Sequence, residues 1–134
     1  MNVEEPKTAV VTILVVDDQP DILQVYSRAL SLAGFSTQLA DTAQSAIELI
    51  EATPPNAILL DLKMPYVNGV GFLYRLRERH PRMPVAVVTG LSVLDDTTAQ
   101  EISSLGASVH FKPLSIVEVQ RIARSLLGIH TDGA

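Results

Sequence analysis

The chain has 134 residues, with 10 basic and 15 acidic side chains, 47% hydrophobic residues, and neither cysteine nor tryptophan. This length and hydrophobic content predict one domain with a real core, and a second full domain does not fit within it. The net charge of −5 has the wrong sign for binding nucleic acid phosphates, so we expect no direct DNA or RNA binding. The absence of cysteine excludes disulfides, thiolate catalysis and cysteine metal sites.

The domain is expected over residues 11–128, with short tails at residues 1–10 and 129–134. The long apolar run near the start, Ala9 to Val16, contains a threonine and ends before two aspartates, so it is too short for a membrane helix. It also lacks the cleavage signature of a secretion signal. We therefore expect a cytoplasmic protein that makes no membrane contact.

Short aliphatic runs alternate with longer segments of helical period, which is typical of a parallel sheet with crossover helices. The predicted elements, in chain order, are strand Val11–Val16, helix Asp21–Ala33, strand Ser36–Leu39, helix Thr42–Ala52, strand Ala57–Leu60, helix Val70–Arg79, strand Val85–Val88, helix Leu94–Leu105, strand Ser108–Phe111 and helix Ser115–Leu127. Five repeats of strand then helix predict a doubly wound α/β domain around a five-stranded parallel sheet.

Turn residues agree with these boundaries. Gly34, Gly106 and Gly128 come just after three predicted helices, where the chain needs a left-handed residue. Pro20 fits the beginning of the first helix. The apolar stripe of that helix, which we expect to face the core, comprises Ile22, Tyr26, Ala29, Leu30 and Ala33.

Polar and charged side chains stand at the carboxyl ends of four predicted strands. Asp17 and Asp18 follow the first strand, Asp61 the third, Thr89 the fourth and Lys112 the fifth. Ligands of doubly wound domains bind outside this edge of the sheet. Each residue type is ordinary by itself, but their coincidence at one edge predicts a functional site.

The residue types at this edge favour phosphoryl chemistry. Three crowded carboxylates repel one another unless a hard divalent cation neutralises them. Oxygen ligands without cysteine or clustered histidine favour magnesium or manganese over zinc. The Lys112 ammonium and the Thr89 hydroxyl supply a positive charge and a hydrogen-bond donor for phosphoryl oxygens. The sequence therefore predicts a site that accommodates phosphate on a carboxylate.

The chain resembles the receiver domain of two-component response regulators from about Thr12 to Leu127. Four segments carry this resemblance: ILVVDD ending at Asp18, LLDLKMPYVNG from Leu59 to Gly69, VVTG from Val87 to Gly90, and FKP from Phe111 to Pro113. The resemblance implies the flavodoxin-like (βα)5 receiver fold with strand order 2-1-3-4-5.

The resemblance also implies a metal-dependent phosphoacceptor. Asp61 is similar to the phosphorylated residue, and Asp18 and Asp61 are similar to direct ligands of Mg2+, or of Mn2+ in its place. Asp17 is similar to the acid that holds the metal through water, and the backbone carbonyl of Lys63 is similar to a further ligand.

Thr89 and Lys112 match the residues that contact the phosphoryl group, and the Lys112–Pro113 bond is expected to be cis. The resemblance implies that Thr89 moves toward the phosphoryl group and that the face of the fourth helix, fifth strand and fifth helix rearranges. Val109 stands three residues before Lys112, where the family often has an aromatic residue. We therefore expect that a rotating tyrosine or phenylalanine does not report activation in this chain.

The expected partners are a sensor histidine kinase or histidine phosphotransfer protein as donor, and a downstream protein target or an output domain absent from these residues. We expect no turnover of small molecules. Lys63 and Leu91 occupy positions that tune the lifetime of the phosphoryl group in the family, and a lysine with an apolar residue there predicts slow self-dephosphorylation. The predicted fourth helix carries acidic residues and the predicted fifth helix carries arginines. These opposite charges are compatible with a homodimer through the fourth helix, fifth strand and fifth helix, but the simpler interpretation is a solvated surface.

One functional alternative stays open from the sequence. It is a degenerate receiver that binds protein partners without phosphorylation, and the intact set of site residues argues against it. A flavin-binding domain of the same fold is disfavoured because Asp17 and Asp18 occupy the place of its phosphate loop. An aspartyl phosphatase of the dehalogenase type is disfavoured because Lys63 stands where its second acid is needed.

Overall fold

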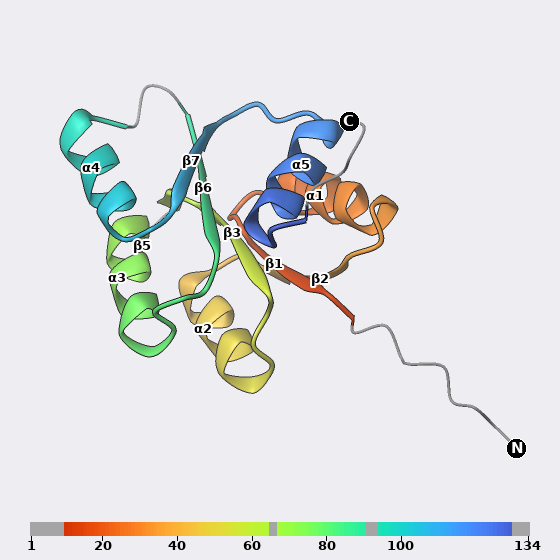
Figure 1. Ribbon diagram of the computed structural model, residues 1–134, viewed down its shortest axis with the longest axis horizontal. Coiled ribbons are helices and arrows are strands. Elements are labelled where there is room, and N and C mark those ends of the chain that lie inside the picture. The colour runs from red at the N-terminus through yellow and green to blue at the C-terminus, as the bar shows by residue number, and fades with distance from the viewer. Residues whose placement is uncertain (1–9, 65–66, 91–93, 130–134) are drawn as a thin grey trace, which may run out of the picture.

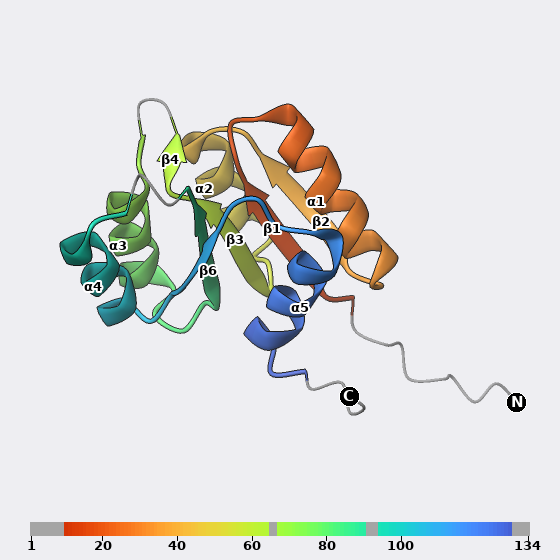
Figure 2. The ribbon, with the colours of Figure 1, turned by 90° about the horizontal axis from the view of Figure 1, so that it is seen from above.

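The computed structural model describes residues 10–64, 67–90 and 94–129, with the side chains of 63–64 and 67–68 excepted. The elements in chain order are β1 (Thr12–Val16), α1 (Pro20–Leu32), β2 (Ser36–Ala40), α2 (Ala43–Ala52), β3 (Ala57–Asp61), β4 (Lys63–Met64), β5 (Val67–Asn68), α3 (Gly69–Arg79), β6 (Val85–Thr89), α4 (Asp96–Ser104), β7 (Ser108–Phe111) and α5 (Ile116–Leu126). The main sheet lies between two layers of helices, with α1 and α5 on one face and α2, α3 and α4 on the other (Figures 1 and 2).

The main sheet has five parallel strands in the order β2-β1-β3-β6-β7. Counting these strands along the chain gives the order 2-1-3-4-5, so both the predicted fold class and the predicted strand order are confirmed. Because all five strands run in the same direction, their carboxyl ends meet at one edge of the sheet.

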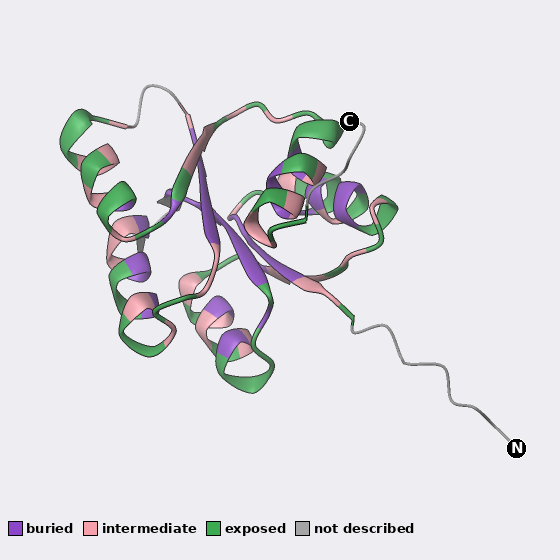
Figure 3. Cartoon of the chain, in the orientation of Figure 1, coloured by how far each residue is buried: buried purple, intermediate pink, exposed green. Residues whose placement is uncertain are grey.

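The central strands are buried on both faces, which explains why their sequences are continuous aliphatic runs (Figure 3). Alternate residues of β1 enter different cores. Leu14 and Val16 pack with residues of α2, α3 and α4, whereas Ile13 and Val15 pack with residues of α1 and α5. The two cores pack against β1, β3 and β6 from both faces of the sheet. This packing fixes where the carboxyl ends of the three strands lie.

Local capping interactions fix where several helices begin. The Thr42 hydroxyl accepts the Ser45 backbone N–H at the start of α2, and the Asp95 carboxylate accepts the Thr98 backbone N–H at the start of α4. Ser115 and Glu118 form a reciprocal capping box at the start of α5. The bond from the Ser115 backbone N–H holds the pKa of the Glu118 carboxyl below its usual range.

Helix C-termini also follow the prediction from sequence. Gly34, Gly106 and Gly128 all have positive φ, at 92°, 75° and 69°, as expected for residues that end a helix with a left-handed turn. Pro20 is the first residue of α1, as expected.

The structure differs from the prediction in three local features. A two-stranded antiparallel sheet of β4 and β5 follows β3, and its strands are too short to show a period in the sequence. Helix α4 begins at Asp96, two residues later than expected, because Asp95 is its N-cap. On α1 the buried positions include Leu23, which the predicted stripe omitted, while Ile22 and the C-cap residue Ala33 of that stripe are only partly buried.

Arg77 of α3 links the C-terminal end of α4 to the segment between α3 and β6. Its guanidinium donates hydrogen bonds to the carbonyls of Leu105 (2.6 Å), Met83 (2.7 Å) and His80 (3.2 Å). Partial burial lowers the pKa of Arg77 from its usual value. These bonds fix the C-terminal end of α4 against the loop that leads into β6. Arg77 makes no such bond to the N-terminal end of α4, which lies nearer the carboxyl ends of the strands.

Candidate functional site

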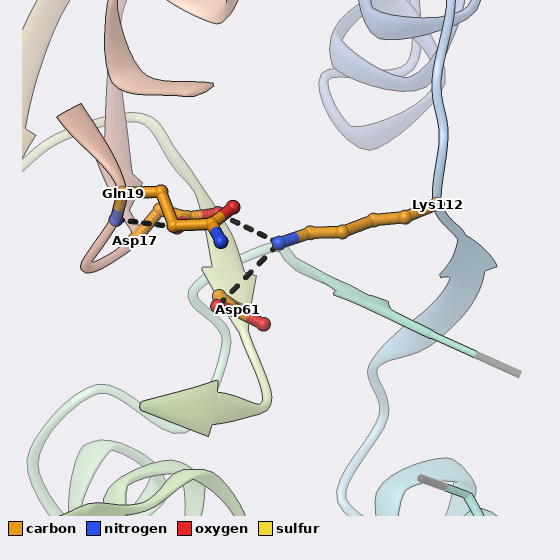
Figure 4. Close-up of polar contacts among 4 residues, drawn as sticks. All are labelled: Asp17, Gln19, Asp61 and Lys112. Atoms are coloured by element: carbon orange, nitrogen blue, oxygen red, sulfur yellow. Dashed lines mark hydrogen bonds and ion pairs between the residues drawn. The ribbon is translucent and has the colours of Figure 1, made fainter. Parts of the chain in front are cut away.

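The structure brings the predicted strand-end residues together at one edge of the sheet. Asp17 follows β1, Asp61 ends β3, Thr89 ends β6 and Lys112 follows β7. Figure 4 shows the Lys112 side chain reaching from β7 toward Asp17 and Asp61.

Three carboxylates form the acidic part of the site. Asp17 and Asp61 are only 2% and 5% exposed, and Asp18 is partly buried. One carboxylate oxygen from each lies within 4.8 Å of the others. This arrangement offers only oxygen donors, which is the ligand set that Mg2+ and Mn2+ prefer.

Lys112 supplies the positive charge of the site. Its Nζ lies 3.0 Å from Asp17 Oδ2 and 3.5 Å from Asp61 Oδ2, and its side chain is 23% exposed. The ammonium therefore contacts two carboxylates that come from different strands (Figure 4). Like-charge repulsion between these carboxylates is relieved by this contact.

Backbone hydrogen bonds fix the position of Asp17. The Gln19 backbone N–H donates to Asp17 Oδ1 at 3.0 Å (Figure 4). The Asp17 backbone N–H donates to the Ala40 carbonyl at 3.0 Å, which continues the pairing of β1 with β2. Because Gln19 is the N-cap of α1, the helix start and the acidic site form one local unit.

Thr89 is fully buried, and its Oγ1 has no hydrogen-bond partner among the residues that the structure describes. Buried hydroxyls without partners are uncommon because desolvating them costs free energy. The Thr89 backbone is held in place, since the Lys112 backbone N–H donates to the Thr89 carbonyl at 2.8 Å. The hydroxyl is thus available to a further polar group at this edge.

Gly69 is a site-supporting residue whose role the sequence analysis did not foresee. A Cβ placed there would lie 2.7 Å from the Leu62 carbonyl oxygen and 2.9 Å from the Leu62 Cα. Leu62 directly follows Asp61, and the Leu62 backbone N–H donates to the Val88 carbonyl at 3.3 Å. Only glycine lets α3 begin this close to the segment that carries Asp61.

Tyr26 is a second unforeseen neighbour of the site. The sequence assigned it only to the core stripe of α1, and it is buried there. Burial, followed by the charges of Asp17, Asp61 and Glu118, raises the pKa of Tyr26 to about 12. The negative charges of Asp17 and Asp61 thus disfavour ionisation of Tyr26 in the adjacent core.

Two residues with predicted roles, Lys63 and Leu91, have side chains that the structure does not describe. Lys63 begins β4, two residues after Asp61, and the role of its backbone carbonyl as a metal ligand stays a prediction. Leu91 lies outside the described residues. The Lys112–Pro113 bond is cis, as expected from the family resemblance.

A sequence model of the response regulator receiver domain family matches residues 13–124. The chain is 34% identical over 117 residues to "Probable transcriptional regulatory protein TcrX" of Mycobacterium tuberculosis, which covers 87% of this chain and 50% of TcrX. It is 30% identical over 125 residues to "Regulatory protein AtoC" of Escherichia coli, which covers 92% of this chain and 27% of AtoC. A solved CheY-like receiver domain of Methanospirillum hungatei is similar with TM-score 0.80 and 27% identity, over 88% of this chain and 94% of that one.

The chain therefore belongs to the response regulator receiver domain family of two-component signal transduction. It spans about half the length of TcrX and a smaller share of AtoC. None of the described helices is long and apolar enough to cross a membrane.

Proposed function

We propose that Asp61 accepts a phosphoryl group and that the resulting aspartyl phosphate switches the domain between two conformations. The observation that carries this proposal is the position of Asp61, which is buried at the end of β3 within a group of three carboxylates and beside Lys112. The nearby buried Thr89 hydroxyl supports the same chemistry, because a phosphoryl oxygen would provide its missing hydrogen-bond partner.

The proposed donor is a phosphohistidine of a sensor histidine kinase or a histidine phosphotransfer protein. A carboxylate oxygen of Asp61 attacks the phosphorus in line and forms a P–O bond. The P–N bond breaks, and its electron pair leaves with the imidazole nitrogen. Lys112, which contacts Asp61 already, stabilises the negative charge on the phosphoryl oxygens.

The residues of the site fit a hard divalent cation. Asp17, Asp18 and Asp61 would hold Mg2+ or Mn2+ through oxygen atoms, and the bound ion would neutralise carboxylate charge and stabilise charge on the phosphoryl oxygens. The Gln19 backbone N–H, which donates to Asp17 Oδ1, holds this carboxylate in position. We infer that metal binding requires Asp17 to share its charge with both the cation and Lys112.

The proposed switch follows the transfer of the phosphoryl group. The Thr89 hydroxyl moves toward a phosphoryl oxygen, and the loop after β6 and the face formed by α4, β7 and α5 rearrange with it. This is a shift of population between two packed states, driven by the new hydrogen bond. The anchor at Arg77 confines the movement of α4 to its N-terminal part.

The proposed output is a protein–protein contact made by the α4–β7–α5 face. Its occupant is a downstream target, an output domain beyond these residues, or a second copy of the chain. An open notch of about 500 Å³ lies between β7 and α5, lined in part by His110, Phe111, Glu118 and Arg121. The donor of the reaction is made with ATP, so the proposal locates the chain in the cytoplasm, and it includes neither turnover of small molecules nor direct binding of nucleic acid.

The proposal is tested by the intact mass of the protein after incubation with acetyl phosphate. We expect a gain of one phosphoryl group with Mg2+, little gain when the metal is chelated, and no gain in Asp61→Asn. An absence of any gain, with folding verified by circular dichroism, would favour the alternative of a receiver that binds partners without phosphorylation.

A further inference from the structure

A pocket of about 230 Å³ lies between α2 and α3, which are neighbours on one face of the sheet (Figures 1 and 2). We call it the α2–α3 pocket. Four of the side chains that line it are apolar: Ile47, Ile50, Phe72 and Leu76. Most of its residues come from the C-terminal halves of the two helices, which end at the amino edge of the sheet. The pocket therefore lies away from the carboxylate site.

The other lining residues are polar or charged: Glu51, Arg75, Glu78, Arg79 and His80. Arg79 Nη1 pairs with Glu51 Oε1 at 2.8 Å and so links α3 to α2, but both side chains are more than half exposed, which makes the pair weak. Arg75 lies one turn before Arg79 on α3 and forms no ion pair within the described part of the chain. The pocket thus has an arginine at its rim whose charge the protein leaves unpaired.

Positive charge is concentrated in the segment that forms this rim. Residues 75–82 contain four arginines and one glutamate, a net charge of +3 in a chain of net −5, so the other residues sum to −8. Arg77 is occupied by three backbone carbonyls. The helix dipole favours arginine in the last turn of α3, but Arg75 and Arg82 lie outside that turn, and both are exposed.

The size of the pocket and its surrounding charge define what it can hold. Its volume is below the range of about 300–1,000 Å³ that is typical of sites for drug-sized ligands, and it suits one large apolar side chain. Such side chains are the usual anchors of protein–protein contacts. The arginines favour acidic residues next to the anchor, whereas the −8 charge of the other residues disfavours an extended polyanion such as nucleic acid.

The wall of the pocket at the end of α3 is held by hydrogen bonds. The His80 backbone N–H donates to the Leu76 carbonyl at 2.7 Å, and Arg77 Nη1 donates to the His80 carbonyl at 3.2 Å. A preformed pocket loses less conformational entropy when it binds a partner. None of its lining residues belongs to the α4–β7–α5 face, so the proposed switch leaves the pocket unchanged.

We propose that the α2–α3 pocket is a docking site for an acidic segment of a partner protein, which presents an aromatic or large aliphatic side chain flanked by Asp or Glu. The apolar side chain enters the pocket, and the flanking carboxylates pair with Arg75 and with the exposed Arg82 two residues beyond His80. This inference goes beyond the proposed function, because docking here requires no phosphorylation of Asp61. The partner is held at the amino edge while the carboxyl edge stays open to the phosphoryl donor.

The test uses the absence of tryptophan from the chain, since the indole emission of a tryptophan peptide then reports binding directly. The probe is the capped peptide acetyl-EDEWEDE-amide, titrated with the full chain. Two control peptides are acetyl-KSKWKSK-amide, which reverses the charge, and acetyl-EDESEDE-amide, which lacks the anchor and serves as a competitor. Arg75→Glu removes the unpaired rim charge, and Arg28→Glu makes the same charge change at an exposed position of α1 on the opposite face of the sheet.

We expect the emission of the acidic tryptophan peptide to shift to the blue and to saturate at peptide affinities typical of weak, transient contacts. Arg75→Glu should weaken binding about ten-fold and Arg28→Glu less than two-fold. Ile47→Phe, which fills the pocket from a partly buried position, should weaken binding several-fold while circular dichroism shows an intact fold. Binding of the lysine peptide with equal affinity, or equal effects of the two arginine variants, would overturn the inference.

Two further arms separate this site from others. Amide signals of the 15N-labelled chain should shift at Ile47, Ile50 and Leu76 on adding the peptide, and shifts confined to β7 and α5 would contradict the proposed location. 1-Naphthoate tests a small anion as the occupant, and naphthoate that binds more tightly than the peptide would contradict a protein partner.

Phosphorylation provides the comparison with the proposed function. Peptide affinity should agree within two-fold before and after treatment with acetyl phosphate and Mg2+, with intact mass giving the phosphorylated fraction. Loss of peptide binding in a chain that is phosphorylated normally would overturn this inference and leave the proposed function standing. Peptide binding by a chain that cannot be phosphorylated would support this inference alone.

Discussion

The Lys112 ammonium lies 3.0 Å from Asp17, a residue 95 positions away in sequence, and this ion pair joins the ends of β7 and β1 across the site. A cation at the carboxylates has to share Asp17 with Lys112. Removing the lysine charge in Lys112→Met should therefore raise the affinity for Mg2+ by about ten-fold, which corresponds to roughly 1.4 kcal/mol of lost repulsion between cations. The same variant should be phosphorylated about 100-fold more slowly, because it lacks the ammonium that we propose to stabilise the phosphoryl oxygens.

Calorimetric titration with Mg2+ measures the first effect, and the time course of intact mass measures the second. Arg79→Met is the matched control, since Arg79 pairs with exposed Glu51 far from the carboxylate cluster. Equal Mg2+ affinity in the unmodified chain and in Lys112→Met would show that Lys112 does not compete with the metal.

Gly69→Ala tests the close approach of α3 to the Asp61 segment. The added Cβ would lie 2.7 Å from the Leu62 carbonyl oxygen, so the backbone must move. We expect a loss of about 2 kcal/mol in the free energy of unfolding, together with slower phosphorylation of Asp61. Urea denaturation and the phosphorylation time course provide the two measurements.

Gly34→Ala is the control for the Gly69 prediction. Gly34 has φ +92° and open space around its Cα, so alanine there costs about 1 kcal/mol through backbone strain alone. It should leave the phosphorylation rate unchanged. Equal effects of the two substitutions on that rate would mean that the approach of Gly69 to Leu62 does not position Asp61.

Tyr26 predicts how stability responds to alkaline pH. Its pKa is raised to about 12 in the folded protein from an ordinary value of 10, mainly by burial and then by Asp17. The folded state therefore holds the phenolic proton more tightly than the unfolded state. The resulting stability is fully present below pH 10 and is lost as the pH rises toward 12, with an upper magnitude of about 2.7 kcal/mol for a shift of two units.

Tyr26→Phe should remove this component, so its unfolding free energy should decline less between pH 10 and 12. Ultraviolet difference titration provides a direct check, because one tyrosine, Tyr26, should ionise only as the pH approaches 12. A titration in which Tyr26→Phe removes no ionisation step above pH 10 from the folded protein would contradict the assignment.

The lifetime of the aspartyl phosphate is predicted from two positions in the sequence, Lys63 and Leu91. A lysine amine can pair with the phosphoryl group, and an apolar leucine gives no help to a hydrolytic water. We expect slow self-dephosphorylation, with a half-life that becomes several-fold shorter in Lys63→Asn and in Leu91→Glu. Decay of the phosphorylated mass after removal of acetyl phosphate measures it, and a half-life no longer in the unmodified chain would argue against this hypothesis.

Much of the fold could be predicted from sequence because central parallel strands are apolar on both faces and amphipathic helices separate them. The residues at the strand ends followed from this alternation, since the end of each buried run is marked by a polar residue such as Asp61 or Thr89. The β4–β5 pair was not predictable, because two-residue strands carry no period.

Other features of the site depend on contacts between distant segments. The sequence placed Lys112 and Asp17 at one edge but did not indicate that they form an ion pair. Likewise, nothing local to Gly69 indicates that its missing side chain makes room for the Leu62 backbone. The neighbourhood of Thr89 and Phe111 depends on the register between β6 and β7, which only the assembled sheet defines.

The most direct test of the central claim is to locate the phosphoryl group. Borohydride reduces an aspartyl phosphate to homoserine, so the protein is treated with acetyl phosphate and Mg2+, reduced, digested and sequenced by mass spectrometry. We predict homoserine at position 61 alone, and none in Asp61→Asn. Homoserine at position 17 or 18, or modification of Asp61→Asn to the same extent, would contradict the assignment of Asp61 as the phosphoacceptor.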